Sequence, residues 1–322
     1  DVFMVFFLFL LGLRGQQCGN DTIQYLRLYK RYSLSDLSSL VNDGQIELGF
    51  KFINKVTSFI FHDFQMLLII TAIISVCPIW YFYKKESEIA ILTIALFLTV
   101  APFGMYFSGI RQTIAMAIGI GAWYAAKNKR KIWFLFIVFV AMQFHISAFV
   151  LLLIYPLYHA RITKNWLWFI IPCMTMIYLF RETIFGFMMT FLWKEYNTTP
   201  ETGAYMILLL LVMFAIYSYV IVDEKLLDQD TIALRNILLL SVVIQIFAML
   251  HPLSMRMNYY FLIFIPILIP KIANRCKRKF RGVGKISVVI MTIYFLCYFL
   301  NNVIGDKDSL NIYPYIPFWE NL

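Results

Sequence analysis

Two arginines and a histidine interrupt long apolar stretches of the chain, at Arg111, Arg256 and His145. A charged side chain at such a position is costly unless it faces a cavity and meets an opposite charge. Guanidinium groups stay charged in almost any environment and bind phosphate oxygens in a bidentate manner. Arg111 and Arg256 therefore predict an anion site, for which a lipid phosphate or pyrophosphate is the expected ligand. His145 is either a hydrogen-bonded packing residue or a base.

Residues that could hold a metal are not arranged for that purpose. We interpret no Asp-x-Asp pair and no histidine cluster of the sequence as suited to holding a divalent cation. The cysteines are scattered without a Cys-x-x-Cys pair: Cys18, Cys77, Cys173, Cys276 and Cys297. A cysteine in or beside an apolar segment behaves as a small hydrophobe. We therefore expect a site that needs no metal or cofactor, and neither a disulfide framework nor a zinc site.

The elements that must position these residues are membrane helices. Of the 322 residues, 61% are hydrophobic and only 14% are charged, with a mean hydropathy of +0.74. Several apolar runs approach or reach the roughly 20 residues that a bilayer-spanning helix needs. We predict an all-α, polytopic membrane bundle of about 10–11 transmembrane helices that forms a single domain over residues 1–322. The net charge of +10 is typical of basic cytoplasmic loops, and no nucleic-acid surface is expected.

Three basic clusters predict the orientation of the bundle. They are Lys84 with Lys85, "KNKRK" at 127–131, and the loop 271–285. If all three lie in the cytoplasm, the segment 14–62 and the aromatic tail 305–322 lie outside. At a rise of 1.5 Å per residue, Arg111, His145 and Arg256 then stand roughly 24, 20 and 22 Å above the cytoplasmic ends of their segments. We expect them to share one level in the outer leaflet of a hydrocarbon core about 30 Å thick.

Two further features accompany this topology. The stretch "IELGFKFINKVTSFIF" (46–61) repeats its apolar positions at helical spacing and predicts an amphipathic helix in the outer interface, as does Thr183–Trp193. The run 132–158 is long for one crossing and is interrupted at Gln143–His145. We favour a broken, re-entrant pair of short helices there, with a single tilted crossing as the alternative. Asp21 and Glu47, in the outer segment, are the plausible general bases beside the arginines.

Five motifs in order resemble those of one protein family. They are "GLRGQQCGNDTIQY" (12–25), "ELGFKFIN" (47–54), "FSGIRQTIAMAI" (107–118), "FHISAFVLLLIYPLY" (144–158) and "RMNYYF" (256–261). This succession resembles the EpsG-type family of bacterial polysaccharide polymerases, which is related in function to Wzy. The motifs reach about residue 265, and the asparagine before Asp21 stands at a variable position.

The resemblance implies an activity and a set of site residues. Such proteins are thought to transfer a growing polysaccharide from undecaprenyl pyrophosphate to a new lipid-linked oligosaccharide repeat unit, at the outer face of the bacterial cytoplasmic membrane. Donor, acceptor and lipid bilayer are the implied partners, and a chain-length regulator is left open. The residues that match the family pattern are Arg14, Asp21, Tyr25, Glu47, Arg111, Gln112, His145, Arg256 and Tyr259.

Joined to the reasoning from charge, this resemblance gives each residue an expected role. Arg111 and Arg256 would bind the pyrophosphate, with Arg14 at the mouth of the cavity. Asp21 or His145 would deprotonate the acceptor hydroxyl, and Glu47 would orient sugar hydroxyls. Tyr25, Gln112 and Tyr259 would contact the substrate. Two other functions stay open: a flippase for lipid-linked sugars, and a membrane-bound acyltransferase that uses His145 as its base.

Overall fold

The chain is almost entirely helical in the computed structural model, which describes residues 1–44, 46–100, 102–192, 204–304 and 312–321. Within these ranges there are 17 α-helices and five short 3₁₀ helices, and no β-strand apart from two isolated bridges. The predicted all-α class is therefore confirmed. Of the predicted outer tail 305–322, residues 305–311 and 322 lie outside the described residues, as does Trp193.

The described residues fall into two compact units. Unit 1 comprises Asp1–Glu86, Pro102–Leu152 and Tyr294–Leu322, and unit 2 comprises Ser87–Ala101 and Leu153–Ile293. The helices of unit 1 are α1 (Val2–Gly12), α2 (Thr22–Leu34), α3 (Leu37–Asn42), α4 (Leu48–Phe61), α5 (Phe64–Glu86), α7 (Met105–Ser108), α8 (Ile110–Lys127) and α9 (Lys131–Met142). Those of unit 2 are α6 (Ala90–Thr99), α10 (Ile154–His159), α11 (Leu167–Leu179), α12 (Arg181–Leu192), α13 (Ala204–Val220), α14 (Gln229–Ala248), α15 (Pro252–Leu262) and α16 (Ile265–Asn274). The 3₁₀ helix η1 (Ile146–Leu153) and α17 (Arg281–Ile304) continue from one unit into the other, and the single-domain prediction stays a prediction.

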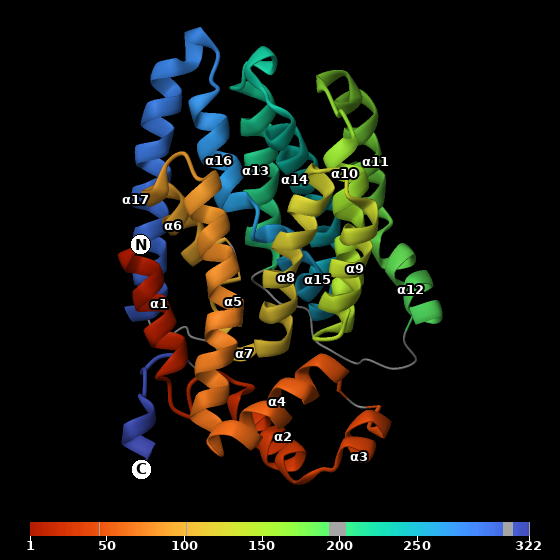
Figure 1. The fold of residues 1–322 in the computed structure, drawn as a ribbon. Helices are drawn as coiled ribbons and strands as arrows, with labels where there is room; N and C mark the ends of the chain where they lie inside the picture. The colour runs from red at the N-terminus through yellow and green to blue at the C-terminus, as the bar shows by residue number, and fades with distance from the viewer. Residues whose placement is uncertain (45, 101, 193–203, 305–311, 322) are drawn as a thin grey trace. The chain divides into compact units, whose positions relative to one another are not determined.

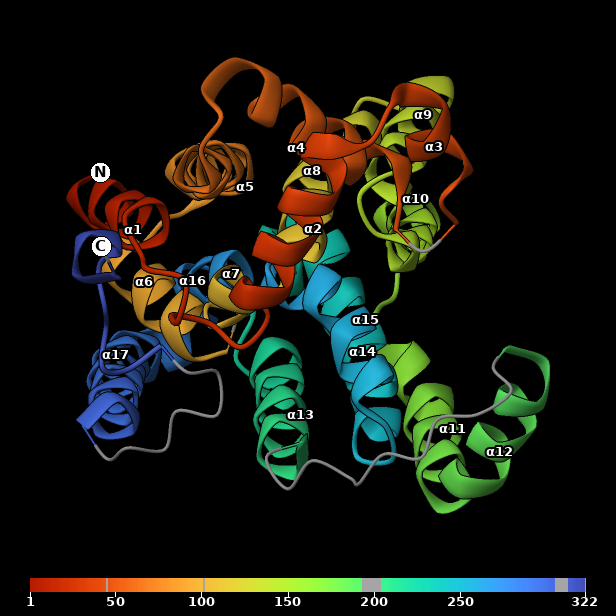
Figure 2. The same cartoon turned by 90° about the horizontal axis from the view of Figure 1, so that it is seen from below.

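In unit 1, a group of short helices packs at one end of the long helices α5 and α8. Figures 1 and 2 show α2 and α4 across the end of α8, and α1 alongside α5. Tyr25 and Tyr29 of α2, Phe50 of α4, Leu67 of α5 and Ile110 of α8 belong to one buried cluster. Burial of this apolar face stabilises α4, so the helix predicted over 46–61 is confirmed. Its place in a membrane interface stays a prediction.

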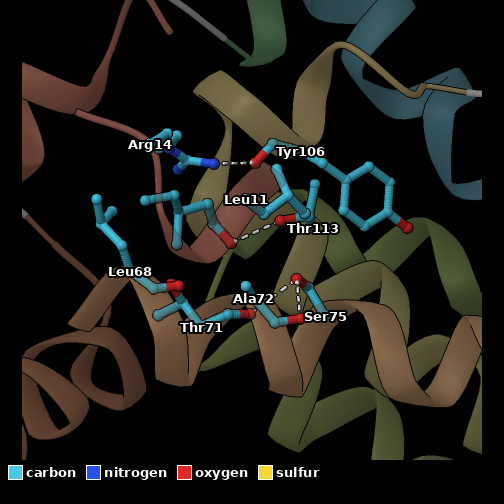
Figure 3. Close-up of a pocket in the computed structure, with 9 residues that line it drawn as sticks. Leu11, Arg14, Leu68, Thr71, Ala72, Ser75, Tyr106 and Thr113 are labelled. Carbon is cyan, nitrogen blue, oxygen red and sulfur yellow. Dashed lines mark hydrogen bonds between the residues drawn. The ribbon is translucent and has the colours of Figure 1, made fainter. Parts of the chain in front are cut away.

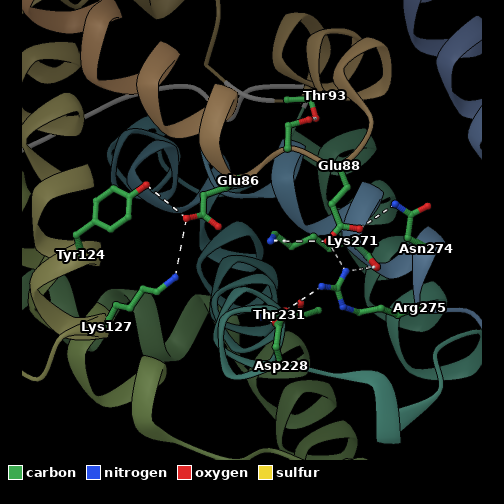
Figure 4. Close-up of polar contacts among 11 residues, drawn as sticks. Glu86, Glu88, Thr93, Tyr124, Lys127, Asp228, Thr231, Lys271, Asn274 and Arg275 are labelled. Carbon is green, nitrogen blue, oxygen red and sulfur yellow. Dashed lines mark hydrogen bonds and ion pairs between the residues drawn. The ribbon is translucent and has the colours of Figure 1, made fainter.

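The two basic clusters of unit 1 lie together at the other end of α5 and α8. The Lys127 ammonium is 3.9 Å from the Glu86 carboxylate, and Lys85 lies over the ring of Tyr124 at 4.8 Å. Figure 4 shows Tyr124 and Lys127 of α8 both directed toward Glu86. Arg111 stands at the opposite end of the same helix. This arrangement is the one that the predicted orientation requires of α5 and α8.

The run 132–158 forms the broken pair that the sequence predicts. A Cβ built on Gly121 of α8 would lie 3.5 Å from Ile137 of α9, and one built on Gly119 would lie 2.9 Å from Leu151 of η1. Leu151 follows the interruption at 143–145, yet it contacts the middle of α8. The chain therefore runs antiparallel to α8 as α9, reverses its direction at 143–145 and runs back along α8 as η1. The alternative of a single tilted crossing is wrong.

Fewer helices than expected are long enough to cross a bilayer. Among the described residues, three are sufficiently long and apolar, namely Phe64–Glu86, Gln229–Ala248 and Gly282–Val303. Two bent pairs raise this number to five: Lys164–Leu179 with Arg181–Thr190 at 72°, and Pro252–Leu262 with Ile265–Asn274 at 48°. The other apolar helices, such as Val2–Gly12 and Ala204–Val220, are shorter than these, so the predicted 10–11 spans are not reached. The chain remains a multi-pass membrane protein.

Unit 2 is built around α14, which packs against α10, α13, α15 and α16. The Asp228 carboxylate accepts a hydrogen bond of 2.7 Å from the Thr231 N–H and so begins this helix. His251 begins α15 in the same way, because its Nδ1 accepts from the Leu253 N–H at 3.1 Å and Pro252 follows at the first helical position. These caps fix the N-terminal ends of α14 and α15.

The first and last described segments of the chain are joined by backbone hydrogen bonds within unit 1. The Gly15 N–H donates to the Ile316 carbonyl at 2.7 Å, and the Phe318 N–H donates to the Leu13 carbonyl at 2.9 Å. The Tyr315 hydroxyl adds a bond of 3.0 Å to the Leu10 carbonyl. The tail thereby fixes the loop that follows α1 and leads to Asp21.

Candidate active site

The carboxylate of Glu47 joins two segments that are distant from it in the sequence. Its Oε2 forms an ion pair with Nη1 of Arg111, at the start of α8. Its Oε1 accepts a hydrogen bond of 3.0 Å from the backbone N–H of Ile146. The two side chains are 24% and 17% exposed, so the pair is partly shielded from water but still accessible. Glu47 therefore neutralises the charge of Arg111 and holds the Arg111 side chain beside the turn that carries His145.

A glycine allows α4 to approach that turn so closely. The Gly49 N–H donates to the Gln143 carbonyl at 2.8 Å. A Cβ at position 49 would lie only 2.7 Å from this carbonyl oxygen and 3.1 Å from the ring of Phe144. No side chain fits there without a shift of backbone. The spacing Glu47-x-Gly49 thus combines the carboxylate with the close contact that positions it.

Tyr25 completes the surroundings of Arg111. It is 5% exposed, its ring packs edge-on against Phe50 with centroids 5.4 Å apart, and its side chain hydrogen-bonds that of Arg111. Burial raises the pKa of Tyr25, the charge of Arg111 opposes this rise, and the charge of Asp21 adds to it. Asp21, Tyr25, Glu47 and Arg111 therefore belong to one electrostatic cluster.

Arg111 still has a donor that no acceptor satisfies. Its Nε is buried and has no hydrogen-bond partner among the described residues. A buried donor left without an acceptor costs about 1–3 kcal/mol. An oxygen of a bound anion would remove this cost, and the fork of a guanidinium can hold one such anion while it keeps its bond to Glu47.

The hydrogen bonds of His145 indicate which ring nitrogen carries its proton. The backbone N–H of Ser147 donates to Nδ1 at 3.3 Å, and the Ser147 hydroxyl lies 2.6 Å from the same nitrogen. Since Nδ1 is an acceptor, the neutral ring holds its proton at Nε2. In this geometry His145 can donate a hydrogen bond from Nε2 to an oxygen of a ligand.

Asp21 lies at the end of a loop that is held against α7, the short helix just before Arg111. The Asn20 N–H donates to the Ser108 hydroxyl at 3.1 Å. Gly19 has φ +93°, a conformation that favours glycine, and a Cβ there would collide with the Phe107 carbonyl. Asp21 occupies the first position before α2, yet its side chain makes no capping hydrogen bond. Its carboxylate is therefore not used by the helix that it precedes.

Arg14 is buried rather than exposed, with 2% of its surface accessible. Nη1 donates to the Tyr106 carbonyl at 3.1 Å, and the guanidinium lies 5.7 Å from the centre of the Phe107 ring. Figure 3 shows Arg14 and Tyr106 on one side of a small cavity, opposite Thr71 and Ser75 of α5. Burial lowers the pKa of Arg14 to about 10. In this structure Arg14 lines an interior cavity, and its predicted place at a cavity mouth stays a prediction.

The remaining predicted site residues are placed as follows. Gln112 is buried on α8 beside Arg111. Arg256 and Tyr259 belong to α15 of unit 2, where Arg256 is exposed and Tyr259 is partly buried. Their convergence with Arg111 and His145 stays a prediction.

One residue of the motif "RMNYYF" has a packing role within unit 2. Asn258 is fully buried, and its amide donates to the Ser241 carbonyl at 3.1 Å and to Oε1 of Gln245 at 2.8 Å. Its Oδ1 accepts from the Ser241 hydroxyl at 2.6 Å. The motif therefore contains both an exposed arginine, Arg256, and a buried asparagine, Asn258, whose amide is hydrogen-bonded.

Reasoning from sequence missed Ser147 and Gly49, although both lie inside the quoted motifs. A serine two residues after a histidine and a glycine two residues after a glutamate are common spacings, and neither indicates a contact by itself. No group of three or more His, Cys, Asp or Glu side chains that could bind a metal occurs in the described part of the chain.

Comparison with known proteins identifies the family. No curated protein and no solved structure matches the chain. The model of the EpsG family matches residues 2–316, which is essentially the whole chain. The chain therefore belongs to the EpsG family, a family of Wzy-like polysaccharide polymerases.

Proposed function

We propose that this protein elongates a polysaccharide by transferring the growing chain from undecaprenyl pyrophosphate to a new lipid-linked oligosaccharide repeat unit. Membership in the EpsG family supports a glycosyltransferase-type polymerase. The observation that carries the assignment of the site is the carboxylate of Glu47, which holds Arg111 and the His145 turn together. Three motifs from separate parts of the chain meet at this one group.

The charge of the leaving pyrophosphate is the main chemical demand of this reaction. As the bond between the anomeric carbon and the pyrophosphate oxygen breaks, its electron pair stays on that oxygen. Arg111 would stabilise this charge through the N–H donors that Glu47 does not use, and its fixed position makes the donors ready before the reaction. Arg256 and Arg14 are proposed to serve the same anion. Because the arginines supply positive charge, the proposal requires no metal ion.

The acceptor hydroxyl must lose its proton as its oxygen bonds to the anomeric carbon. We assign this proton to Asp21, whose carboxylate makes no capping bond and lies in the electrostatic cluster of Tyr25 and Arg111. His145 would donate from Nε2 to a substrate oxygen, because its Nδ1 already accepts from Ser147. Glu47 retains lone pairs for a sugar hydroxyl while it orients Arg111. Tyr25, Gln112 and Tyr259 are proposed to contact the sugars.

The site is proposed to face the outside of the bacterial cytoplasmic membrane. Arg111 stands at the end of α8 opposite Lys127, and the basic end of the helix is expected in the cytoplasm. Cysteines introduced at 127–131 should therefore react only with reagents that reach the cytoplasm. External labelling at these positions would contradict the proposed orientation.

The test of the activity uses the purified protein in lipid nanodiscs with lipid-linked repeat units of its own polysaccharide. Elongation to chains of several repeats is expected, and EDTA should leave it unchanged. Translocation without elongation, or acylation of the sugar, would replace the proposal by one of the two other functions.

Variants of Arg111 test the assignment of the site. Arg111→Ala should reduce the elongation rate by about 100- to 1,000-fold, the usual cost of removing one donor to a developing anion. Arg111→Lys should recover only part of the rate, because an ammonium lacks the bidentate fork. Arg27→Ala, which removes an exposed arginine of α2, is the control and should elongate normally. Normal elongation by correctly folded Arg111→Ala would refute the role of Arg111.

A further inference from the structure

A second cationic site lies in unit 2, far along the chain from the residues of the proposed reaction. Its pocket, which we name the Arg235 pocket, has a volume of about 370 Å³ and is lined by Arg161, Ile162, Thr163, Glu224, Leu227, Gln229, Ile232 and Arg235. Arg235 is 1% exposed and forms two bonds with the Glu224 carboxylate, at 2.8 and 3.2 Å. It also donates to the Ile162 carbonyl at 2.9 Å and lies 4.0 Å from the Tyr219 ring centre.

The loops around this pocket are held together by backbone bonds. Val222 and Cys276 form an isolated antiparallel bridge, and the Asp223 N–H donates to the Arg275 carbonyl at 2.8 Å. The Lys277 N–H donates to the Ile221 carbonyl at 3.0 Å. The loop between α13 and α14 is thereby fixed to the loop between α16 and α17. The positions of the cations in both loops are consequently set by the backbone.

Positive charge near the pocket exceeds the negative charge. Lys164 follows the lining residue Thr163 and lies within electrostatic range of Lys277, Glu224 and Arg235. Glu224 is the one carboxylate that lines the pocket in the described part of the chain, and Arg235 already uses both of its oxygens.

Other cations nearby are paired with carboxylates, so the excess of positive charge is specific to the surroundings of the Arg235 pocket. Arg275 pairs with Glu88 at 2.5 Å and with Asp228 at 2.8 Å, and Lys271 lies 3.9 Å from Glu88. Figure 4 shows these carboxylates directed at their cations. Among the described residues no carboxylate pairs with Lys164 or Lys277, and the Lys277 ammonium donates to the Val220 carbonyl at 2.9 Å. In addition, Nε of Arg235 is buried without a hydrogen-bond partner in the described structure. The pocket is therefore lined by two guanidinium groups and one carboxylate, and it contains an unused buried donor.

Two exposed tryptophans stand close in the sequence to the lining residues Arg161–Thr163. Trp166 and Trp168 follow Lys164 directly and are 55% and 88% exposed. Tryptophan is enriched at membrane–water interfaces, where its ring lies at headgroup depth. Basic pockets between transmembrane helices at this depth bind anionic headgroups. We propose that the Arg235 pocket binds the phosphate of an anionic membrane phospholipid, held by Arg161, Lys164, Lys277 and Arg235. This inference is independent of the proposed polymerase reaction.

The test measures lipid binding and needs no enzymatic activity. The full chain, purified in a neutral detergent, is titrated with dioleoylphosphatidylglycerol, with dioleoylphosphatidylcholine and with inorganic phosphate, and bound lipid is counted by native mass spectrometry. Binding of the phosphatidylglycerol in preference to the phosphatidylcholine is expected. Since a lysine near an anionic membrane surface contributes roughly a fivefold gain in affinity, the double variant Lys164→Gln with Lys277→Gln should bind about 30-fold more weakly.

Controls separate a specific pocket from general surface charge. Lys279→Gln removes an exposed charge from the same loop as Lys277 and should bind the lipid normally. Lys164→Arg with Lys277→Arg keeps both charges and should also bind normally, which separates loss of charge from loss of fold. An equal loss in Lys279→Gln, or equal binding of both lipids, would overturn the proposal. Displacement of the lipid by millimolar phosphate would assign the pocket to a free phosphate instead.

Discussion

Gly49→Ala tests whether the contact between α4 and the turn at 143–145 sets the geometry of the site. The added methyl carbon would lie 2.7 Å from the Gln143 carbonyl oxygen, whereas ordinary contacts of a Cβ begin at 3.4 Å. Relief of this overlap moves α4 away from the turn by about 0.7 Å, because the obstacle is backbone and cannot rotate away. The bond between Glu47 and the Ile146 N–H, now 3.0 Å, would then lengthen to about 3.7 Å and be lost.

The expected effect on activity follows from this displacement. A misplacement of about 1 Å in an active site can reduce a rate by roughly 100-fold, so Gly49→Ala should elongate about 10- to 100-fold more slowly than the unchanged protein. The assay is the rate of chain extension on lipid-linked repeat units in nanodiscs, with folding checked by size-exclusion chromatography. Gly44→Ala is the matched control, because a Cβ at position 44 meets no atom within 4 Å. Full activity of folded Gly49→Ala would refute the reasoning that this contact positions Glu47.

Three further predictions concern other parts of the structure. Glu47→Gln removes the charge that orients Arg111 and should slow elongation by at least about tenfold in the same assay, since a charge-assisted bond contributes roughly 1.5–3 kcal/mol; an unchanged rate would contradict this. Arg256→Ala should reduce elongation, because this guanidinium is proposed to bind the pyrophosphate; an unchanged rate of the folded variant would contradict this. Asn258→Leu should lower the melting temperature, because it leaves buried polar groups without partners; an unchanged melting temperature would contradict this. Asp36 accepts hydrogen bonds from Ser38 and Ser39, and these bonds lower its pKa to about 2. The cap that Asp36 forms on α3 is therefore complete above the ordinary pKa of 3.8 and is lost as the pH falls through 2. A carboxyl NMR titration with a midpoint near 3.8 would exclude this.

The sequence indicated correctly those elements whose pattern is local. The interruption at Gln143–His145 combines a polar pair with a run too long for one crossing, and the chain reverses there. The spacing of apolar residues over 46–61 predicted α4, whose apolar face is buried. These features depend on periodicity and polarity within about twenty residues, which can be read directly from a sequence.

The number of spans could not be predicted in the same way, because hydropathy does not show where a helix bends or ends. The apolar run 89–107 ends its first helix at Thr99, and Pro102 and Gly104 interrupt it before α7. The run near 256–270 is divided between α15 and α16 with a bend of 48°. Interruptions of this kind leave the average hydropathy almost unchanged.

The partner of Arg111 could not be predicted from the sequence either. Its charge correctly required a negative group, and the reasoning from charge supplied one from a ligand. The structure supplies Glu47, which is 64 residues away in the chain. The contact depends on Gly49 and on the docking of α4 at the turn, and both arise from tertiary packing. A single sequence holds no signal for such a pair.

The bonds between the two described ends of unit 1 bear on how the protein matures during its synthesis. Leu13 and Gly15 find these backbone partners only at Phe318 and Ile316, so the bonds cannot form until the ribosome has made residue 318. The loop that carries Asp21 thus reaches its final conformation only after these late residues have been made. A nascent chain that has not reached residue 318 would therefore be inactive.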